Sequence, residues 1–217
     1  VVITETPEVA EAAKLLENTF RLINIAFMHE FNQLLSAQGI DTNAVVEAAS
    51  TKPYGFMPFR SGVGIGGHCI PVDPMYLSWW ARENGSTSRL VELADLVSRS
   101  MPKYVAGRAL SLIDRNSVRK RVLVLGVAYK QGLADTRETP ASELIAKLRE
   151  EGAEVKWHDP LVGSWGEEQS SPVDWECDIA ILATNQPGIS INSHLERGIP
   201  VLDCTNSYRG VDGVIAL

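Results

Sequence analysis

A cysteine at the end of a glycine-rich segment is the first residue of this chain that could do chemistry. The segment covers residues 62–74 and reads GVGIGGHCIPVDP, with the thiol at Cys69. Glycine lets a backbone pass close to a ligand, and a thiol presented by such a loop is a candidate nucleophile. Asp73 adds a carboxylate four residues later. The simpler interpretations are a buried structural cysteine and an Asp-Pro pair that only starts a helix.

Three glycines of this segment also match G-x-G-x-x-G, the fingerprint of a dinucleotide-binding turn. That fingerprint has to follow a strand and open a helix. Residues 54–61 include Pro58 and show no alternation of apolar and polar side chains, so they do not predict a strand. Pro71 and Pro74 are expected to prevent a helix from starting at the last glycine. We therefore predict a loop that holds a substrate and the thiol rather than a cofactor.

Lys14 and Asn18 form a second pair of candidates. They are four residues apart on an expected helix, so they project from one face of it, one turn apart. With Cys69 and Asp73 they would supply an ammonium, an amide, a thiol and a carboxylate. These groups can stabilise an oxyanion, trap an aldehyde and activate a water molecule. The alternative for Lys14 is a solvated lysine on a helix surface.

A basic turn follows the first strand of the second half of the chain. It reads GVAYKQGLADTRETP, and Lys130 and Arg137 flank it ahead of a helix that begins near Thr139. A strand, a basic turn and a helix N-terminus make a phosphate-binding arrangement at the carboxyl edge of a parallel sheet. Asp159, at the end of the next strand, could bind the ribose of a dinucleotide. Both features could also be ordinary solvated turns.

The order of the predicted elements indicates two domains. Apolar periodicity and capping residues predict only helices in the first half, over residues 7–38, 41–49, 73–85 and 87–116. Strands then alternate with helix, over residues 121–126, 140–150, 153–157, 178–183 and 200–203. We therefore predict an all-α domain over residues 1–118. An α/β Rossmann-like domain with a doubly wound parallel sheet is predicted over residues 119–217.

Composition and charge narrow the class of protein. The chain has 217 residues, of which 45% are hydrophobic and 22% charged, as expected of a globular protein. Its net charge of −7 argues against a nucleic-acid partner, and no apolar run reaches the length of a membrane span. The three cysteines are far apart and form no C-x-x-C pair, which argues against a metal site and suits a reducing cytoplasm.

Three stretches together resemble the UDP-glucose/GDP-mannose dehydrogenase family, through its central helical domain and its C-terminal nucleotide-binding domain. They are EAAKLLENTFRLINIAFMHE, GVGIGGHCIPVDPMYL and VLGVAYKQGLADTRETPASELI. The amino-acid sequence around the cysteine is most similar to that of the branch that oxidises UDP-N-acetylhexosamines, such as UDP-N-acetylglucosamine or its epimer. Oxidation of UDP-glucose or GDP-mannose stays an alternative.

The resemblance implies an NAD-dependent, two-step oxidation of the sugar C6 alcohol to a carboxylate. Cys69 would be the nucleophile that carries a thiohemiacetal and then a thioester, so that Cys69→Ser in the complete enzyme would abolish acid formation. Lys14 and Asn18 would stabilise oxyanions, and Asp73 would assist the lysine and the water. The resemblance also implies a homodimer through the helical domain.

The resemblance places the remaining site residues around the substrate. Lys130 would reach the active-site cleft from the C-terminal domain, and Arg137 lies in a motif of that domain. Phe59 and Arg60 would pack on the nucleotide sugar, and Gly66 belongs to the glycine segment that shapes the substrate loop.

Two departures from the family pattern leave alternatives open. The family's N-terminal NAD-binding domain is expected to be absent from this chain, with residues 1–6 as the last residues after it, so NAD would be bound mainly elsewhere. A D-T-R-N motif near the end of the branch is here residues 203–206, DCTN, which puts one ligand contact in doubt. The rival hypotheses are a non-catalytic module that binds a UDP-sugar or only dimerises, and a true NAD domain over residues 119–217.

Overall fold

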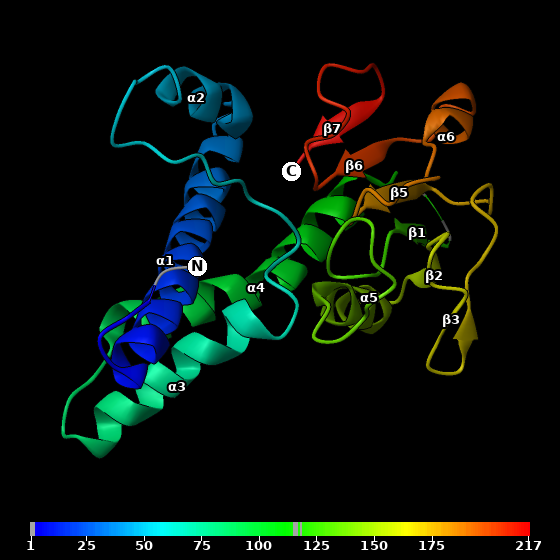
Figure 1. The fold of residues 1–217 in the computed structure, drawn as a ribbon. Coiled ribbons are helices and arrows are strands. Elements are labelled where there is room, and N and C mark those ends of the chain that lie inside the picture. Colours follow the sequence, from blue (N-terminus) through cyan, green and yellow to red (C-terminus); the bar gives the residue numbers. More distant parts are fainter. Residues whose placement is uncertain (1–2, 115–116, 118) are drawn as a thin grey trace.

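The structure, a computed structural model, describes residues 3–114, 117 and 119–217. It has a helical part followed by a part built on a sheet, shown side by side in Figure 1. The helical part contains α1 (Pro7–Ser36), α2 (Thr42–Ala49), α3 (Cys69–Glu83) and α4 (Arg89–Leu112). The predicted end of the last helix at Asn116 lies outside the described residues, as does one residue at the predicted domain boundary of 118 and 119.

Helix α1 starts where its capping residues predict. The Thr6 side chain accepts a hydrogen bond from the Val9 amide, and Pro7 occupies the first helical position. Four apolar side chains that the periodicity places on this helix are largely exposed, namely Leu16, Phe20, Phe27 and Leu34. They share one face of α1, while Leu22 and Ala26 face the helical core with residues of α4. The helix therefore has two apolar faces, of which this chain covers one.

Helix α3 begins four residues earlier than the sequence predicts. We expected Pro71 and Pro74 to prevent a helix, but the helix runs through both, from Cys69 to Glu83. The first amide groups of a helix have no carbonyl partner within it, so Pro71 in the first turn costs no hydrogen bond. Asp73 consequently lies inside the helix and does not cap it. The prediction that Asp73 and Pro74 start this helix is wrong.

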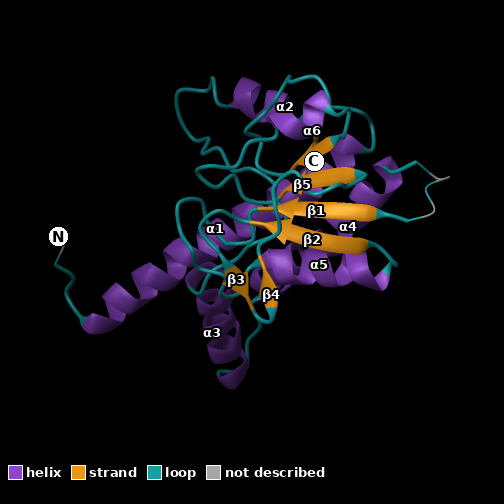
Figure 2. Ribbon diagram, turned by 90° about the vertical axis from the view of Figure 1, so that its right-hand side faces the viewer, coloured by secondary structure: helices purple, strands orange, loops and turns teal. Residues whose placement is uncertain are grey.

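The second part is a parallel sheet with helices on both faces. Its elements are β1 (Arg121–Leu125), α5 (Pro140–Glu150), β2 (Glu154–His158), β5 (Ile179–Leu182), α6 (Asn192–Glu196), β6 (Val201–Asp203) and β7 (Val214–Ala216). A small antiparallel hairpin of β3 (Ser164–Trp165) and β4 (Glu168–Gln169) follows β2. The strand order is β2-β1-β5-β6-β7, with every pair parallel, and Figure 2 shows β2, β1 and β5 side by side. The predicted fold class is confirmed, although the hairpin, α6 and β7 were not predicted.

Alternate side chains of the strands pack on opposite faces of the sheet. Val122 and Val124 face a core made with α4 and α5, whereas Leu123 and Leu125 face a second core on the side of α6. Burial on both faces explains the nearly continuous apolar run of β1. Helix α4 contacts α1 and α3 in the helical part and α5 in the sheet part. It therefore fixes how the two parts are oriented.

Candidate active-site cleft

A cleft of about 630 Å³ lies between α1, the glycine-rich segment and the turn after β1. The turn lies at the carboxyl edge of the sheet, beside the point between β1 and β5 where the strand order reverses. Ligands of doubly wound sheets bind at this switch point. The cleft brings together seven of the nine predicted site residues, which are Lys14, Asn18, Arg60, Gly66, Cys69, Lys130 and Arg137.

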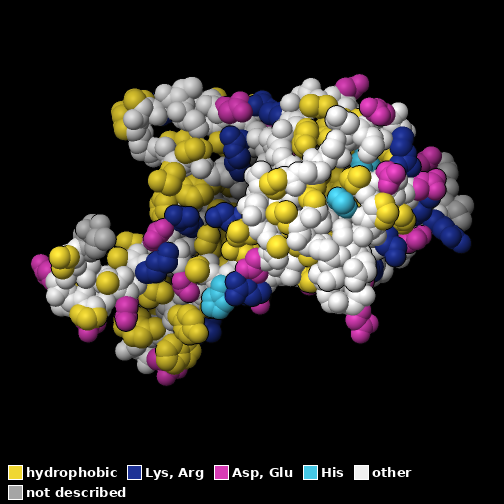
Figure 3. Space-filling model, turned by 45° about the vertical axis from the view of Figure 1, so that its right-hand side comes forward, with side chains coloured by type: hydrophobic (Ala, Val, Ile, Leu, Met, Phe, Trp, Pro, Cys, Tyr) yellow, Lys and Arg dark blue, Asp and Glu magenta, His cyan; other side chains and the backbone are white. Residues whose placement is uncertain are grey.

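The cleft carries positive charge although the chain as a whole is acidic. Five basic and two acidic side chains line it, an excess of three positive charges, whereas the whole chain has a net charge of −7. Figure 3 shows basic side chains gathered along the hollow between the helical part and the sheet part. Such a concentration of one sign of charge attracts anions into a cleft.

Cys69 is the first residue of α3 and is exposed, in contrast to the other cysteines. His68 before it provides no side-chain cap for the helix, so the amides of the first turn stay available for an anionic ligand atom. Cys177 and Cys204 are buried. Burial raises the pKa of the Cys177 thiol to about 11 and raises the pKa of the Cys204 thiol further. Cys69 is therefore the only one of the three placed to act as a nucleophile.

Asp73 and Asn18 form one unit. The Asn18 side chain is only 2% exposed, and its Nδ2 donates a hydrogen bond of 2.6 Å to Oδ2 of Asp73. This contact joins α1 to the helix that begins with the thiol. The ammonium of Lys14, one turn before Asn18, lies 3.4 Å from Glu17, which also accepts from Arg21 at 2.8 Å.

The glycines before the thiol are required by a close approach to the sheet part. A Cβ at Gly66 would lie 2.7 Å from Cβ of Tyr129, 2.8 Å from Cδ of Pro140 and 2.9 Å from the Glu138 carbonyl oxygen. A Cβ at Gly67, where φ is +84°, would lie 2.7 Å from the Tyr129 ring. The turn after β1 therefore sets the position of the backbone that leads into Cys69.

Lys130 and Arg137 both reach the cleft from this turn. Arg137 makes a bidentate pair with Asp135, with contacts of 2.6 to 3.1 Å. Hydrogen bonds from Arg137 lower the pKa of the Asp135 carboxyl to about 2, so this pair is charged at neutral pH. The Lys130 ammonium is exposed and has no acceptor among the described residues. Lys130 is the cation of this turn that is free to meet a ligand.

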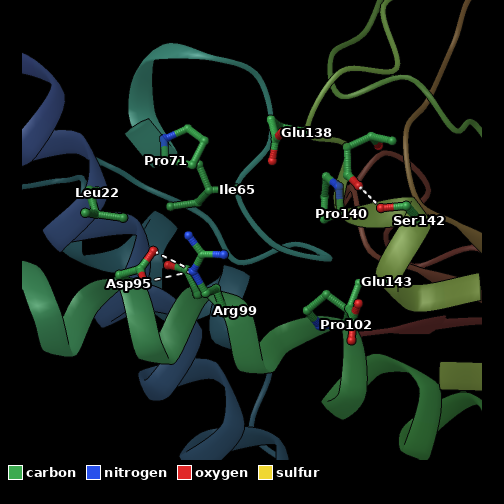
Figure 4. A pocket seen from close by; sticks show the side chains of 12 residues that line it. Leu22, Ile65, Pro71, Asp95, Arg99, Pro102, Glu138, Pro140, Ser142 and Glu143 are labelled. Carbon is green, nitrogen blue, oxygen red and sulfur yellow. Dashed lines mark hydrogen bonds and ion pairs between the residues drawn. The ribbon is translucent and has the colours of Figure 1, made fainter. Parts of the chain in front are cut away.

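The predicted phosphate-binding arrangement at the start of α5 is not assembled. The Thr139 side chain accepts from the Ala141 amide, and its carbonyl accepts from the Ser142 amide and hydroxyl. The start of α5 lines a separate cavity of about 400 Å³ on the α4 side, shown in Figure 4. That cavity holds the ion pair of Asp95 and Arg99 together with two further carboxylates. Its excess of negative charge does not suit a phosphate.

Asp159 does not bind a ribose, because it is used within the fold. It is 1% exposed, and one carboxylate oxygen accepts from the amides of Val127 and Ala128 at 2.9 and 3.2 Å. The other oxygen accepts from two amides of its own turn. The amides that would meet a pyrophosphate in a dinucleotide turn are thus already bonded. The turn after β1 does not fit NAD, which counts against an NAD domain over residues 119–217.

Two predicted substrate residues have other contacts. The Phe59 ring packs edge to face on Phe20 of α1, with 5.8 Å between ring centroids, and is not among the residues that line the cleft. The Arg60 guanidinium donates to Oδ1 of Asn43 on α2 at 3.0 Å while it also lines the cleft. Thr205 stands where the resemblance implies an arginine, and it bonds Asp203 at the end of β6.

Several cleft residues were missed by the sequence analysis. Arg21, Ile25 and His29 continue the face of α1 that carries Lys14 and Asn18. The helical spacing that links Lys14 to Asn18 would have predicted them as well. Tyr129 precedes Lys130 in sequence, but only the fold shows that its ring meets the glycine segment.

The described residues contain no group of three or more histidine, cysteine, aspartate or glutamate side chains that could hold a metal ion. None of the helices that the structure describes combines the length and apolar character that a membrane span requires.

Comparison with known proteins supports the class that fold and cleft define. Residues 8–99 match the central domain of the UDP-glucose/GDP-mannose dehydrogenase family, and residues 123–210 match the UDP-binding domain of the same family. The chain belongs to the UDP-glucose/GDP-mannose dehydrogenase family.

Individual relatives are named as dehydrogenases of UDP-N-acetylhexosamines. The UDP-N-acetyl-D-mannosamine dehydrogenase of Pyrococcus horikoshii is 34% identical over 181 residues, 82% of this chain and 42% of that protein. The UDP-N-acetyl-D-glucosamine 6-dehydrogenase of Pseudomonas aeruginosa is 37% identical over 72% of this chain and 37% of that protein. The solved structure of the Pyrococcus horikoshii UDP-D-ManNAc dehydrogenase has a TM-score of 0.79 at 31% identity and covers 94% of this chain. The chain covers 50% of that structure and less than half of the two relatives.

The exposure of the thiols predicts which of them reacts. In the native chain at mildly alkaline pH, one thiol of the three should react quickly with Ellman's reagent, because Cys177 and Cys204 are buried and their pKa values are raised. Cys69→Ser should remove this fast phase and leave slow reaction of the other two. Equal rates for all three thiols, or a fast phase that persists in Cys69→Ser, would contradict the site.

The contact between Gly66 and the turn after β1 predicts a difference between two glycines of one segment. Gly66→Ala should destabilise the chain by about 1–3 kcal/mol, because the new methyl group overpacks against Tyr129 and Pro140. Gly62→Ala is the matched control, since its Cβ would meet only the Cys204 carbonyl oxygen at 3.5 Å, and it should change stability by less than about 0.5 kcal/mol. Urea unfolding measures both, and equal losses would disprove the close approach.

Proposed function

We propose that this chain is the substrate-binding and thiol-bearing part of an NAD-dependent UDP-sugar 6-dehydrogenase. One observation carries the proposal. An exposed thiol at a helix N-terminus shares a positively charged cleft with an ammonium and an amide from α1. The excess of positive charge suits a nucleoside diphosphate, and the polar groups that line the cleft together with Cys69 suit chemistry at the sugar end of the ligand.

The chain's own residues account for the covalent half of the reaction. The Cys69 sulfur adds to the C6 aldehyde carbon, and the carbonyl oxygen becomes a thiohemiacetal oxygen that Lys14 and the α3 amides stabilise. Once this intermediate is oxidised to a thioester, water attacks its carbonyl carbon. The C–S bond then breaks, which releases the carboxylate and returns the thiol. Asp73 holds Asn18 in place for both steps through their 2.6 Å hydrogen bond.

NAD, the cofactor that the family implies, would accept the hydride in each oxidation. The turn after β1 does not fit NAD, because Asp159 occupies its amides. We propose that NAD is bound mainly by a part of the enzyme other than these 217 residues. The names of the relatives favour a UDP-N-acetylhexosamine as the substrate, and UDP-glucose is the alternative to test beside it.

A titration with UDP tests the binding half of the proposal. Calorimetry should detect binding of UDP to the chain. Lys130→Ala should weaken it by about tenfold or more, because a hydrogen bond from a charged group to a phosphate is lost. Arg99→Ala is the matched control, since Arg99 lines the other cavity and pairs with Asp95. No heat with UDP, or an equal loss in both variants, would contradict the proposal.

The exposed apolar face of α1 supports a homodimer. Leu16, Phe20, Phe27 and Leu34 lie on the face opposite the cleft residues, and covering them would remove a large apolar surface from water. Sedimentation velocity should therefore show two chains per particle. If the chain is a monomer at concentrations at which it still binds UDP, the binding site does not require this dimer interface.

A further inference from the structure

His29 lies at the end of the cleft remote from the thiol, and the proposed chemistry does not use it. It follows Asn18 by eleven residues on α1, about 16 Å along the helix axis and on the same face. Ile25 lies between them and also lines the cleft. The face of α1 thus extends from the groups that would act on the sugar to an imidazole at the opposite end.

The His29 ring is buried and neutral, and its hydrogen-bond partner, Ser61, directly precedes the glycine-rich segment. It is 1% exposed, and a hydrogen bond of 3.0 Å joins its Nδ1 to Oγ of Ser61. Burial lowers the pKa of His29 to about 4, so the ring carries no charge at neutral pH. Its Nε2 has no hydrogen-bond partner among the described residues. The hydrogen bond to Ser61 is therefore the one that offsets the burial of this polar ring among the described residues.

Ser61 is the middle residue of a short stretch that lies beside three different elements. Arg60 before it bonds Asn43 of α2 at 3.0 Å. Arg60 and Ser61 also line a small cavity together with Asp203 and Cys204, at the end of β6. Ser61 itself bonds His29 of α1. All three residues of the stretch line the cleft. Residues 60–62 thus form a wall of the cleft that two hydrogen bonds tie to the helical part and that lies beside the end of β6.

We propose that His29 is a positioning residue for nucleotide binding, which acts by holding Ser61 and with it the cleft wall of residues 60–62. The inference rests on the proposed function, because the ligand at this wall is the nucleotide half of a UDP-sugar. With the sugar at Cys69 and the diphosphate at the basic side chains, the nucleoside extends along α1 toward His29. Loss of the contact weakens nucleotide binding and leaves the thiol unaffected.

Two substitutions of His29 separate positioning from bulk. His29→Asn keeps a polar atom near the place of Nδ1, whereas His29→Leu removes it. UDP affinity, measured by calorimetry on the 217-residue chain, should fall about tenfold in the leucine variant, as expected for one lost hydrogen bond. It should stay close to the wild-type value in the asparagine variant. The rate at which Ellman's reagent modifies Cys69 should be the same in all three proteins.

A double-mutant cycle with Ser61→Ala tests whether the effect passes through the contact. Ser61→Ala should weaken UDP binding as His29→Leu does, and the double variant should bind no worse than either single variant, because both remove the same interaction. Additive losses would overturn the inference, and so would a leucine variant that binds UDP as the wild type does. Ser61→Ala replaces a residue of a loop, so it keeps the test decisive if His29→Leu does not fold.

Hydrogen exchange keeps this inference distinct from the proposed function. Amide exchange of residues 60–62 should be faster than in the wild type in His29→Leu and Ser61→Ala, and should match the wild type in His29→Asn. A wild-type chain that does not bind UDP would count against the proposed function, while unchanged exchange in the leucine variant would overturn the positioning role whatever UDP does.

Discussion

The close packing of the glycine segment on the turn after β1 is the contact on which the site depends. Gly66 and Gly67 let the backbone lie against Tyr129 and Pro140 at distances that no side chain would allow. The thiol follows two residues later, at the first position of α3. The sheet part therefore fixes the position of Cys69, although this residue belongs to the helical part. In this chain the glycines allow contact between the helical part and the sheet part, and the phosphate-binding function of such a motif is not needed to explain them.

Helix α1 contacts several parts of the molecule, and each of its faces makes a different kind of contact. One face carries the polar residues of the cleft, a second packs on α4 through Leu22 and Ala26, and a third presents exposed apolar side chains. Thirty residues of continuous helix allow this. The hydrogen bond between Asn18 and Asp73 then joins the polar face to α3. A rigid helix can in this way hold both ends of an elongated ligand in register.

The two cavities beside the glycine segment differ in the charge of the side chains that line them. The cleft has an excess of basic side chains, while the neighbouring cavity has an excess of carboxylates. Ile65 lines both of them. An anionic ligand is therefore directed to the side on which the thiol lies. Sequence reasoning placed the start of α5 and the basic turn in one anion site, but the fold turns the helix start toward the acidic cavity and leaves Lys130 in the cleft.

The fold class, the first helix with its cap, and the main parallel strands could be predicted from the sequence, because these follow from local periodicity and capping. It also singled out Cys69, Lys14, Asn18 and Asp73 as chemical groups. How these groups are placed relative to one another depends on the folded chain. The start of α3 at Cys69, the engagement of Asp73 by Asn18, and the structural use of Asp159 all depend on partners distant in the chain. Hydrogen bonds between distant segments leave no periodic signal, so a single sequence does not reveal them.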